Sequence, residues 1–245
     1  MAGDFWLIVA GAATAGFVQG LSGFAFSLVS LSFWAWGLEP QRAAVLATVG
    51  GLTGQVLAAL AVRRGSRWRT LWPFIAGGLC GIPLGVLLLP HVDLRSFKLL
   101  IGSLLVLWCP LMLFSGRLPH FRAGRAADAA VGAVGGLMGP LGGFTGAVPT
   151  LWCTLRGMAR DEQRAVVQNF NLTMLAVSTA AYVQRGLLTP ALYADLGLVA
   201  ASLTLPALLG MRVYIGISAQ AFRQLVLGLL TLSGLALLAS AWHAP

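Results

Sequence analysis

The stretch that decides the fold is Gly16-Phe-Val-Gln-Gly-Leu-Ser-Gly-Phe-Ala-Phe-Ser-Leu-Val29, within an apolar N-terminal region that reads at first as one long membrane helix. Its fourteen residues include three glycines, a glutamine and two serines. Glycine destabilises a helix interior by roughly 1 kcal/mol relative to alanine, and a buried amide needs a hydrogen-bond partner. We therefore expect the helix to be interrupted here.

The composition predicts an integral membrane protein. The 245 residues are 58% hydrophobic and 9% charged, with a mean hydropathy of +0.85, whereas soluble domains carry about 25% charged residues. The apolar runs are continuous rather than alternating, so helices are the expected spanning elements. The net charge of +9 comes from basic residues between apolar runs, where membrane anchors belong. The expected partner is the lipid bilayer, and no nucleic acid.

The residues that could carry catalysis or bind a metal form no recognisable set. Cys80, Cys109 and Cys153 lack CxxC spacing, which argues against a zinc site or a disulfide framework. All acidic and histidine residues lie at or near the ends of apolar runs, with no Ser/His/Asp set and no paired carboxylates at a common depth. We therefore expect no enzyme, no metal and no cofactor, and no coupling through a buried carboxylate.

A membrane-spanning helix needs roughly 20 residues. Six runs of this length are clear candidates: 43–62, 71–90, 98–115, 165–184, 191–211 and 223–242. Two further regions, 5–38 and 126–157, are apolar but interrupted by glycines. Their pieces, of about 12–16 residues, are short for a simple crossing.

The chain repeats itself in a fixed order. Gly20-Leu-Ser-Gly-Phe24 matches Pro140-Leu-Gly-Gly-Phe144 at an offset of 120, and Gln41-Arg-Ala43 matches Gln163-Arg-Ala165 at an offset of 122. Further matches follow at slowly growing offsets. This predicts an all-α membrane protein of two homologous halves, 1–118 and 119–245. Each half opens with an interrupted region, 5–38 or 126–157, and continues with three of the six spans.

The distribution of basic residues predicts the orientation of the halves. If each interrupted region enters and returns, twelve basic residues share one side and four, Arg42, Arg95, Lys98 and Arg185, face the other. If each crosses once, the division is eight to eight. The positive-inside rule favours the first arrangement, which gives inverted repeats with both termini periplasmic. Re-entrant hairpins and pairs of short crossings both remain open.

The second interrupted region indicates what the first is for. Gly135-Gly-Leu-Met-Gly-Pro-Leu-Gly-Gly-Phe-Thr-Gly-Ala-Val-Pro149 contains six glycines and two prolines. Pro140 should stop the helix, and Gly142-Gly143 should let the chain reverse with positive φ. The next helix would then begin near 143–145, as its counterpart begins near 22–24, and helix N-termini favour anions. Two such ends can converge at the midplane of a transporter. The alternative is that the glycines only allow close helix packing.

Polar residues inside the spans extend the candidate site. Gln168, Asn169, Asn171 and Thr173 open the 165–184 span, whereas the matching stretch 45–50 has only Thr48, with Gln55 following. Amides could donate to the oxygens of an anion, or bond to neighbouring helices. The predicted substrate-binding set is Gln19, Ser22, Gly23, Phe24, Gly142, Gly143, Phe144, Thr145, Gln168, Asn169 and Asn171.

The chain resembles the TauE/SafE family of sulfite exporters and sulfonate permeases. The resemblance lies in "GFVQGLSGFAF", "GGLMGPLGGFTGAVPTL", "RRG", "GIPLGVLL", "LPALLGMRVYIG" and "AFRQLVLGLLTLSGLALL", while "QNFNL" departs from the usual second-half pattern. It implies movement of sulfite, a sulfonate or a related small anion across the bacterial inner membrane. Our leading hypothesis is a transporter that works by alternating access. An anion channel, a non-transporting assembly factor and a homo-oligomer remain open.

Overall fold

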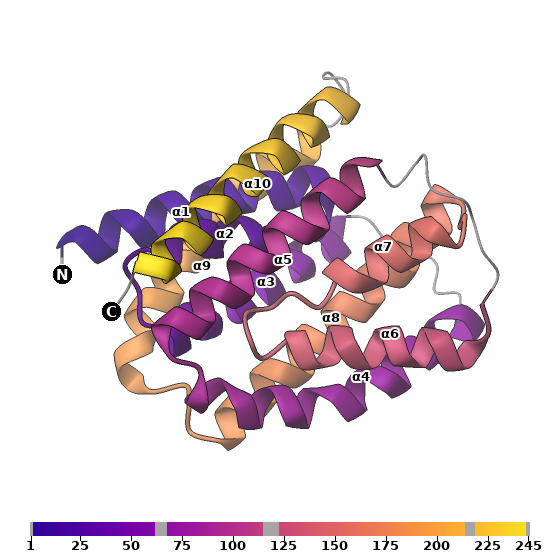
Figure 1. Ribbon diagram of the computed structural model, residues 1–245, viewed down its shortest axis with the longest axis horizontal. Helices are drawn as coiled ribbons and strands as arrows, with labels where there is room; N and C mark the ends of the chain where they lie inside the picture. Colours follow the sequence, from indigo (N-terminus) through magenta and orange to yellow (C-terminus); the bar gives the residue numbers. More distant parts are fainter. Residues whose placement is uncertain (1, 62–67, 115–122, 214–218, 244–245) are drawn as a thin grey trace.

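A computed structural model describes residues 2–61, 68–114, 123–213 and 219–243, so the boundary predicted at 118/119 lies outside the described residues. All the regular structure in these ranges is helical (Figure 1). The elements are α1 (Ala2–Ser22), α2 (Phe26–Trp34), α3 (Pro40–Ala61), α4 (Trp68–Leu88), η1 (Leu89–His91), α5 (Leu94–Phe114), α6 (Arg125–Met138), α7 (Ala147–Leu155), α8 (Arg160–Gln184), α9 (Pro190–Val213) and α10 (Ala219–His243).

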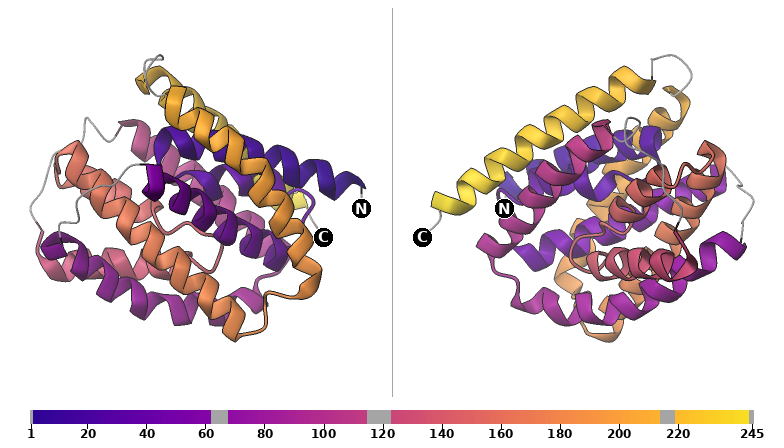
Figure 2. Two further views of the ribbon diagram at one scale, coloured as in Figure 1. Left: turned by 180° about the vertical axis from the view of Figure 1, so that it is seen from behind. Right: turned by 45° about the vertical axis from the view of Figure 1, so that its right-hand side comes forward.

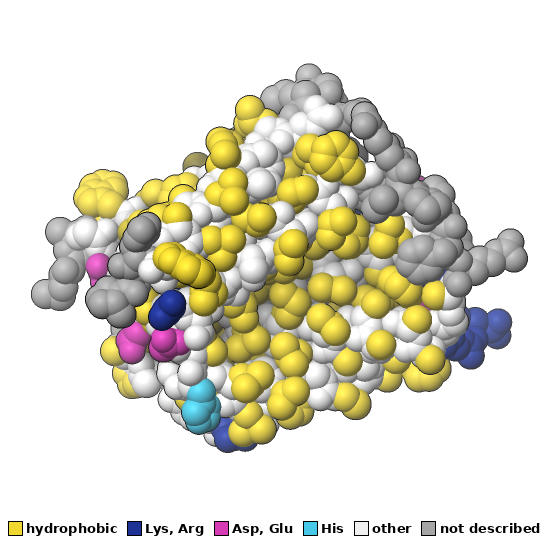
Figure 3. Space-filling view, viewed as in Figure 1, with side chains coloured by type: hydrophobic (Ala, Val, Ile, Leu, Met, Phe, Trp, Pro, Cys, Tyr) yellow, Lys and Arg dark blue, Asp and Glu magenta, His cyan; other side chains and the backbone are white. Residues whose placement is uncertain are grey.

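Six of the described helices are long and apolar enough to cross a membrane: α1, α3, α4, α5, α9 and α10. Hydrophobic side chains cover the middle of the face shown in Figure 3, and the coloured charged groups lie toward its two ends. The predicted span 165–184 forms most of α8, which is 25 residues long but falls outside this group of six. Its glutamines and asparagines lower its hydropathy. The chain is a multi-pass helical membrane protein.

The pieces of the interrupted regions were predicted to have about 12–16 residues, and only α6, with 14, does so, whereas α2 and α7 have 9 each and α1 has 21. Helix α1 runs unbroken for 21 residues, not 12–16, because Gly16 and Gly20 lie inside it, where it packs on α9. A Cβ on either glycine would approach the backbone of Leu203 or Ala207 to less than 3.0 Å. These two glycines therefore serve close helix packing, which was the alternative explanation for them.

Within the interrupted regions, the chain leaves the helical conformation between α1 and α2 and again between α6 and α7. We call residues 23–25, between α1 and α2, the first interruption, and residues 139–146, between α6 and α7, the second interruption. Gly23 has φ +87°, Gly142 +155° and Gly143 +76°. The prediction of positive φ at Gly142 and Gly143 is thus confirmed. A Cβ on Gly23 would meet nothing within 4 Å, so this glycine is required for its backbone conformation alone.

The helices run back and forth between two ends of the molecule. Helix α1 begins and α10 ends at the same end, while α5 ends and α6 begins at the opposite one (Figures 1 and 2). Helix α1 packs along α9, α4 along α6, and α5 along α10, while α3 and α8 are in contact. At the α4–α6 contact, Gly77 and Gly81 face the carbonyl groups of Ala129 and Ala133 too closely for any side chain. This backbone contact fixes α6, and with it the approach to the second interruption.

Candidate functional site

The second interruption is held by hydroxyl and indole groups from three other helices. Tyr182 on α8 donates to the carbonyl oxygen of Pro140. The Thr48 hydroxyl on α3 lies 3.2 Å from the carbonyl oxygen of Gly139. Trp108 on α5 donates through Nε1 to the carbonyl oxygen of Ala147 at 2.7 Å. Carbonyl groups beside the interruption are therefore paired inside the protein, as membrane depth requires.

Some of the N–H groups at this interruption are also paired. Gly143 N–H donates to Gly139 at 2.6 Å, Phe144 N–H to Met138 at 3.3 Å, and Ala147 N–H back to the carbonyl oxygen of Phe144 at 3.2 Å. Among the described residues, no partner is found for the N–H groups of Thr145 and Gly146. They stand immediately before the first turn of α7 and are the donors that a ligand could use.

Asn171 on α8 adds a side-chain donor at the same place. The Thr145 hydroxyl donates to Asn171 Oδ1 at 2.9 Å, which fixes the orientation of the amide. A Cβ on Gly146 would lie 2.6 Å from Asn171 Nδ2, so the NH₂ end of the amide rests against the start of α7. Thr145 and Asn171 are 1% and 2% exposed. The predicted pair is thus brought together from positions 26 residues apart.

The first interruption is held differently. Ser22 Oγ accepts from the N–H of Ala25 at 3.3 Å and more distantly from that of Phe24. Gln55 on α3 donates through Nε2 to the carbonyl oxygen of Gly23 at 2.7 Å. Gln19 donates through Nε2 to the carbonyl oxygen of Gly51 at 3.3 Å. One of the two N–H hydrogens of Gln19, a residue predicted to bind an anion, is therefore used by Gly51.

The two interruptions lie close together. The rings of Phe24 and Trp108 meet edge to face with 5.7 Å between centroids, and Trp108 in turn bonds to Ala147. Ser27, in the first turn of α2, lies against Gly143 so closely that a Cβ there would overlap its Oγ. Elements from both parts of the sequence therefore surround the start of α7.

Three other predicted residues differ in exposure. Phe144 is buried, and Gln168 and Asn169 are half-buried. Asn169 donates to the carbonyl oxygen of Ala165 in its own helix at 2.8 Å. The predicted set lacks Ser27, Thr48, Gln55, Trp108 and Tyr182. Thr48 and Gln55 stood out as polar residues in an apolar run, but the two aromatic residues gave no sign of their bonds to the second interruption.

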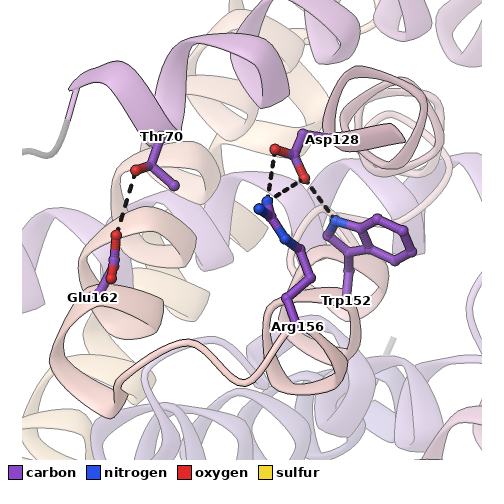
Figure 4. A network of polar contacts seen from close by, with 5 residues as sticks. All are labelled: Thr70, Asp128, Trp152, Arg156 and Glu162. Atoms are coloured by element: carbon purple, nitrogen blue, oxygen red, sulfur yellow. Dashed lines mark hydrogen bonds and ion pairs between the residues drawn. The ribbon is translucent and has the colours of Figure 1, made fainter. Parts of the chain in front are cut away.

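Ion pairs join neighbouring helices at each end of the molecule. Arg156, just after α7, reaches both carboxylate oxygens of the buried Asp128 at 2.7 and 2.8 Å, and Trp152 Nε1 donates to the same carboxylate at 2.8 Å (Figure 4). Beside this network, Thr70 Oγ1 lies 3.4 Å from Glu162. These contacts tie α7 to α6, and α4 to α8.

At the opposite end, Arg42 pairs with Asp4 at 2.8 Å and with Asp195 at 2.8 Å. The pairs join the start of α3 to α1 and α9. Among the described residues, no group of three or more His, Cys, Asp or Glu side chains could hold a metal ion.

Apolar spanning helices around two interruptions define a polytopic helical membrane protein. The chain belongs to the sulfite exporter TauE/SafE family, whose family model matches residues 7–237. The predicted resemblance is therefore confirmed over nearly the whole sequence. No curated protein and no solved structure matches the chain significantly.

Proposed function

We propose that the protein moves a small anion, namely sulfite, an organosulfonate or a related sulfur or carboxylate anion, across the bacterial inner membrane by alternating access. Membership of a family of exporters supports the class of activity. The observation that carries the site is the donor group before α7: two unpaired N–H groups and the oriented amide of Asn171. The anion is bound there, between the two interruptions.

The chemistry of this donor group suits an anion that must be released again. Each neutral donor stabilises an oxyanion by a hydrogen bond, and the dipole of α7 adds partial positive charge at its N-terminus. Because all three donors are neutral, none of them holds the anion by a fixed positive charge. Gln168 and Asn169 precede Asn171 on α8, and Ser22 approaches from the first interruption; together with the nearby backbone of 23–24 and 142–144 they complete the proposed site.

We further propose that the halves 1–118 and 119–245 are inverted repeats. In the sequence match, α1 corresponds to α6, and α4 corresponds to α9. The contact of α1 with α9 is therefore equivalent to the contact of α6 with α4. Gly23 and Gly143 occupy matched positions, and both have left-handed φ. The first half runs from one end of the molecule to the other, and the second runs back (Figure 1). Rocking of one half against the other would expose the site alternately.

The arrangement has a definite topology. The ends of α3 and α5 and the starts of α4, α6 and α8 lie at one end of the molecule (Figures 1 and 2), which is the side of the twelve basic residues in the return arrangement. This end is proposed to be cytoplasmic and both termini periplasmic. A C-terminal reporter that is active only in the periplasm tests this, and a cytoplasmic C-terminus would contradict it.

Transport is tested in proteoliposomes loaded with candidate anions. Asn171→Ala and Gly143→Leu should lower flux well below that of the wild type. The control Thr204→Ala should not, because the Thr204 hydroxyl only bonds to its own helix at Ala200. Folding is checked by size-exclusion chromatography and thermal unfolding. Saturation and counterflow distinguish a transporter from a channel, and normal flux in both site variants would overturn the site assignment.

A further inference from the structure

Two hydrogen-bond acceptors without a partner lie near the first interruption, whereas the second interruption has donors without one. The Oε1 atoms of Gln19 and Gln55 are both buried and without a hydrogen-bond partner in the described structure, and the two side chains are 3% and 1% exposed. A buried amide oxygen without a partner is destabilising by about 1–3 kcal/mol. Two such acceptors, on side chains that pack against α3 near the first interruption, suit a positively charged ligand.

The orientation of these two amides is fixed by their surroundings. Only the NH₂ end of a glutamine can pair with a carbonyl group, and each amide faces one: Gly51 for Gln19 and Gly23 for Gln55. The oxygens must therefore point away from these carbonyl groups. In each glutamine, the oxygen and the nitrogen of the amide therefore cannot be exchanged.

The Gln19 side chain, which comes from α1, packs against α3 next to the position of Gln55. The side chain of Gln19 lies directly over Gly54, where a Cβ would come within 2.7 Å of Oε1. Gln55 is the next residue and reaches the first interruption one turn beyond Gln19. Gly54 is therefore the glycine that makes room for the Gln19 amide beside Gln55.

Helix α1, which ends at the first interruption, adds further negative charge. Helix α1 is 21 residues long and ends at Ser22, so its last carbonyl groups carry partial negative charge. Unwound carbonyl groups and helix C-termini of this kind hold sodium ions in transporters with interrupted helices. Neutral oxygens can supply such a site, and no carboxylate is needed.

We propose that the first interruption binds a monovalent metal cation, Na⁺, through Gln19 Oε1, Gln55 Oε1 and carbonyl groups at the end of α1. The role of the cation rests on the proposed transport function, because the cation would accompany the anion bound before α7 and offset its charge. Binding of the cation itself does not depend on the anion, so the two proposals can fail separately.

The test is thermal unfolding of the purified protein in NaCl, KCl or choline chloride at equal ionic strength, with no sulfur anion added. At ten times its Kd, Na⁺ should raise the Tm of the wild type by about 3–6 °C over choline. Gln55→Leu and Gln19→Leu should each abolish this rise. Gln163→Leu is the matched control: it loses bonds to Thr150 and Thr154, so its Tm should fall while the Na⁺-dependent rise persists.

Equal Tm values of the wild type in all three salts would overturn the cation site, as would an unchanged rise in the two site variants. An equal rise in KCl would show a cation site that is not selective for Na⁺ and would overturn the assignment of the ion. Repeating the experiment with sulfite in choline chloride tests the anion site alone. A sulfite response without a Na⁺ response would leave the proposed function standing and refute this inference.

Discussion

Replacing one glycine in each interruption measures how tightly the second interruption is packed against the rest of the protein. Gly23 and Gly143 have nearly the same backbone conformation, with φ +87° and +76°. Their surroundings differ. A Cβ at Gly23 would meet nothing within 4 Å, whereas a Cβ at Gly143 would overlap Ser27 Oγ and press on the backbone of Thr48. The substitution to alanine therefore adds the same strain at both sites and a clash at only one.

The magnitudes follow from this difference. A left-handed conformation costs an L-residue about 1–2 kcal/mol, so Gly23→Ala should lower the free energy of unfolding by that amount. Gly143→Ala adds the cost of overpacking, typically about 1–3 kcal/mol, for a total of about 2–5 kcal/mol. With about 2–4 °C per kcal/mol for a chain of this size, we expect Tm to fall by about 2–8 °C in the first variant and about 4–20 °C in the second.

The assay is thermal unfolding in detergent, and Ser27→Ala supplies the control. Removing the Ser27 hydroxyl should restore part of the loss caused by Gly143→Ala, because the overlapping atom is gone, and none of the loss caused by Gly23→Ala. Equal losses in the two single variants, with no recovery from Ser27→Ala, would refute the packing of α2 against the second interruption.

Three further variants test the packing, the pairing at the second interruption and the ion pair of Asp128 with Arg156. Gly81→Ala should separate α4 from α6 and lower Tm by several degrees. Gly228→Ala is the control and should leave Tm unchanged or higher, because a Cβ there meets nothing within 4 Å. An equal fall in both variants would contradict the close contact. Tyr182→Phe should destabilise the protein by about 1–3 kcal/mol, because the carbonyl oxygen of Pro140 loses its donor, and denaturant-dependent unfolding measures this; an unchanged stability would contradict the bond. Asp128→Asn should destabilise the protein by a similar amount in the same measurement, because Arg156 loses the carboxylate whose two oxygens it contacts. The destabilisation should persist in 0.5 M NaCl. If it disappears in salt, the ion pair is exposed and screened, which would contradict its burial.

Much of the fold follows from the sequence because hydropathy and glycine spacing act locally. Five of the six predicted spans match helices that are apolar enough to cross a membrane. The positive φ of Gly142 and Gly143 could be predicted because glycine has no Cβ and the helix must stop at Pro140. The predicted break-up of α1 was too extensive. Gly16 and Gly20 look like helix breakers in the sequence, and only the presence of α9 beside them reveals their role in packing.

The candidate site could be predicted only in part. The interruptions and the polar residues near them are visible in the sequence, but the polarity of an amide depends on its partner. Gln19 looks like a donor for an anion in the sequence, and only the structure shows that Gly51 accepts one hydrogen bond from its NH₂ group. The bonds of Trp108 and Tyr182 to the second interruption join residues about 40 positions apart. An aromatic residue in an apolar run otherwise resembles ordinary core.

The central claim is that an anion binds at the donor group before α7, and binding of sulfite to the purified protein tests it most directly. We expect sulfite to raise the Tm of the wild type in a saturable way, and Asn171→Ala to abolish that rise while its Tm without sulfite shows that the protein remains folded. If sulfite, sulfonates, thiosulfate and small carboxylates all leave the Tm of the wild type unchanged, or if Asn171→Ala responds as the wild type does, the claim is contradicted.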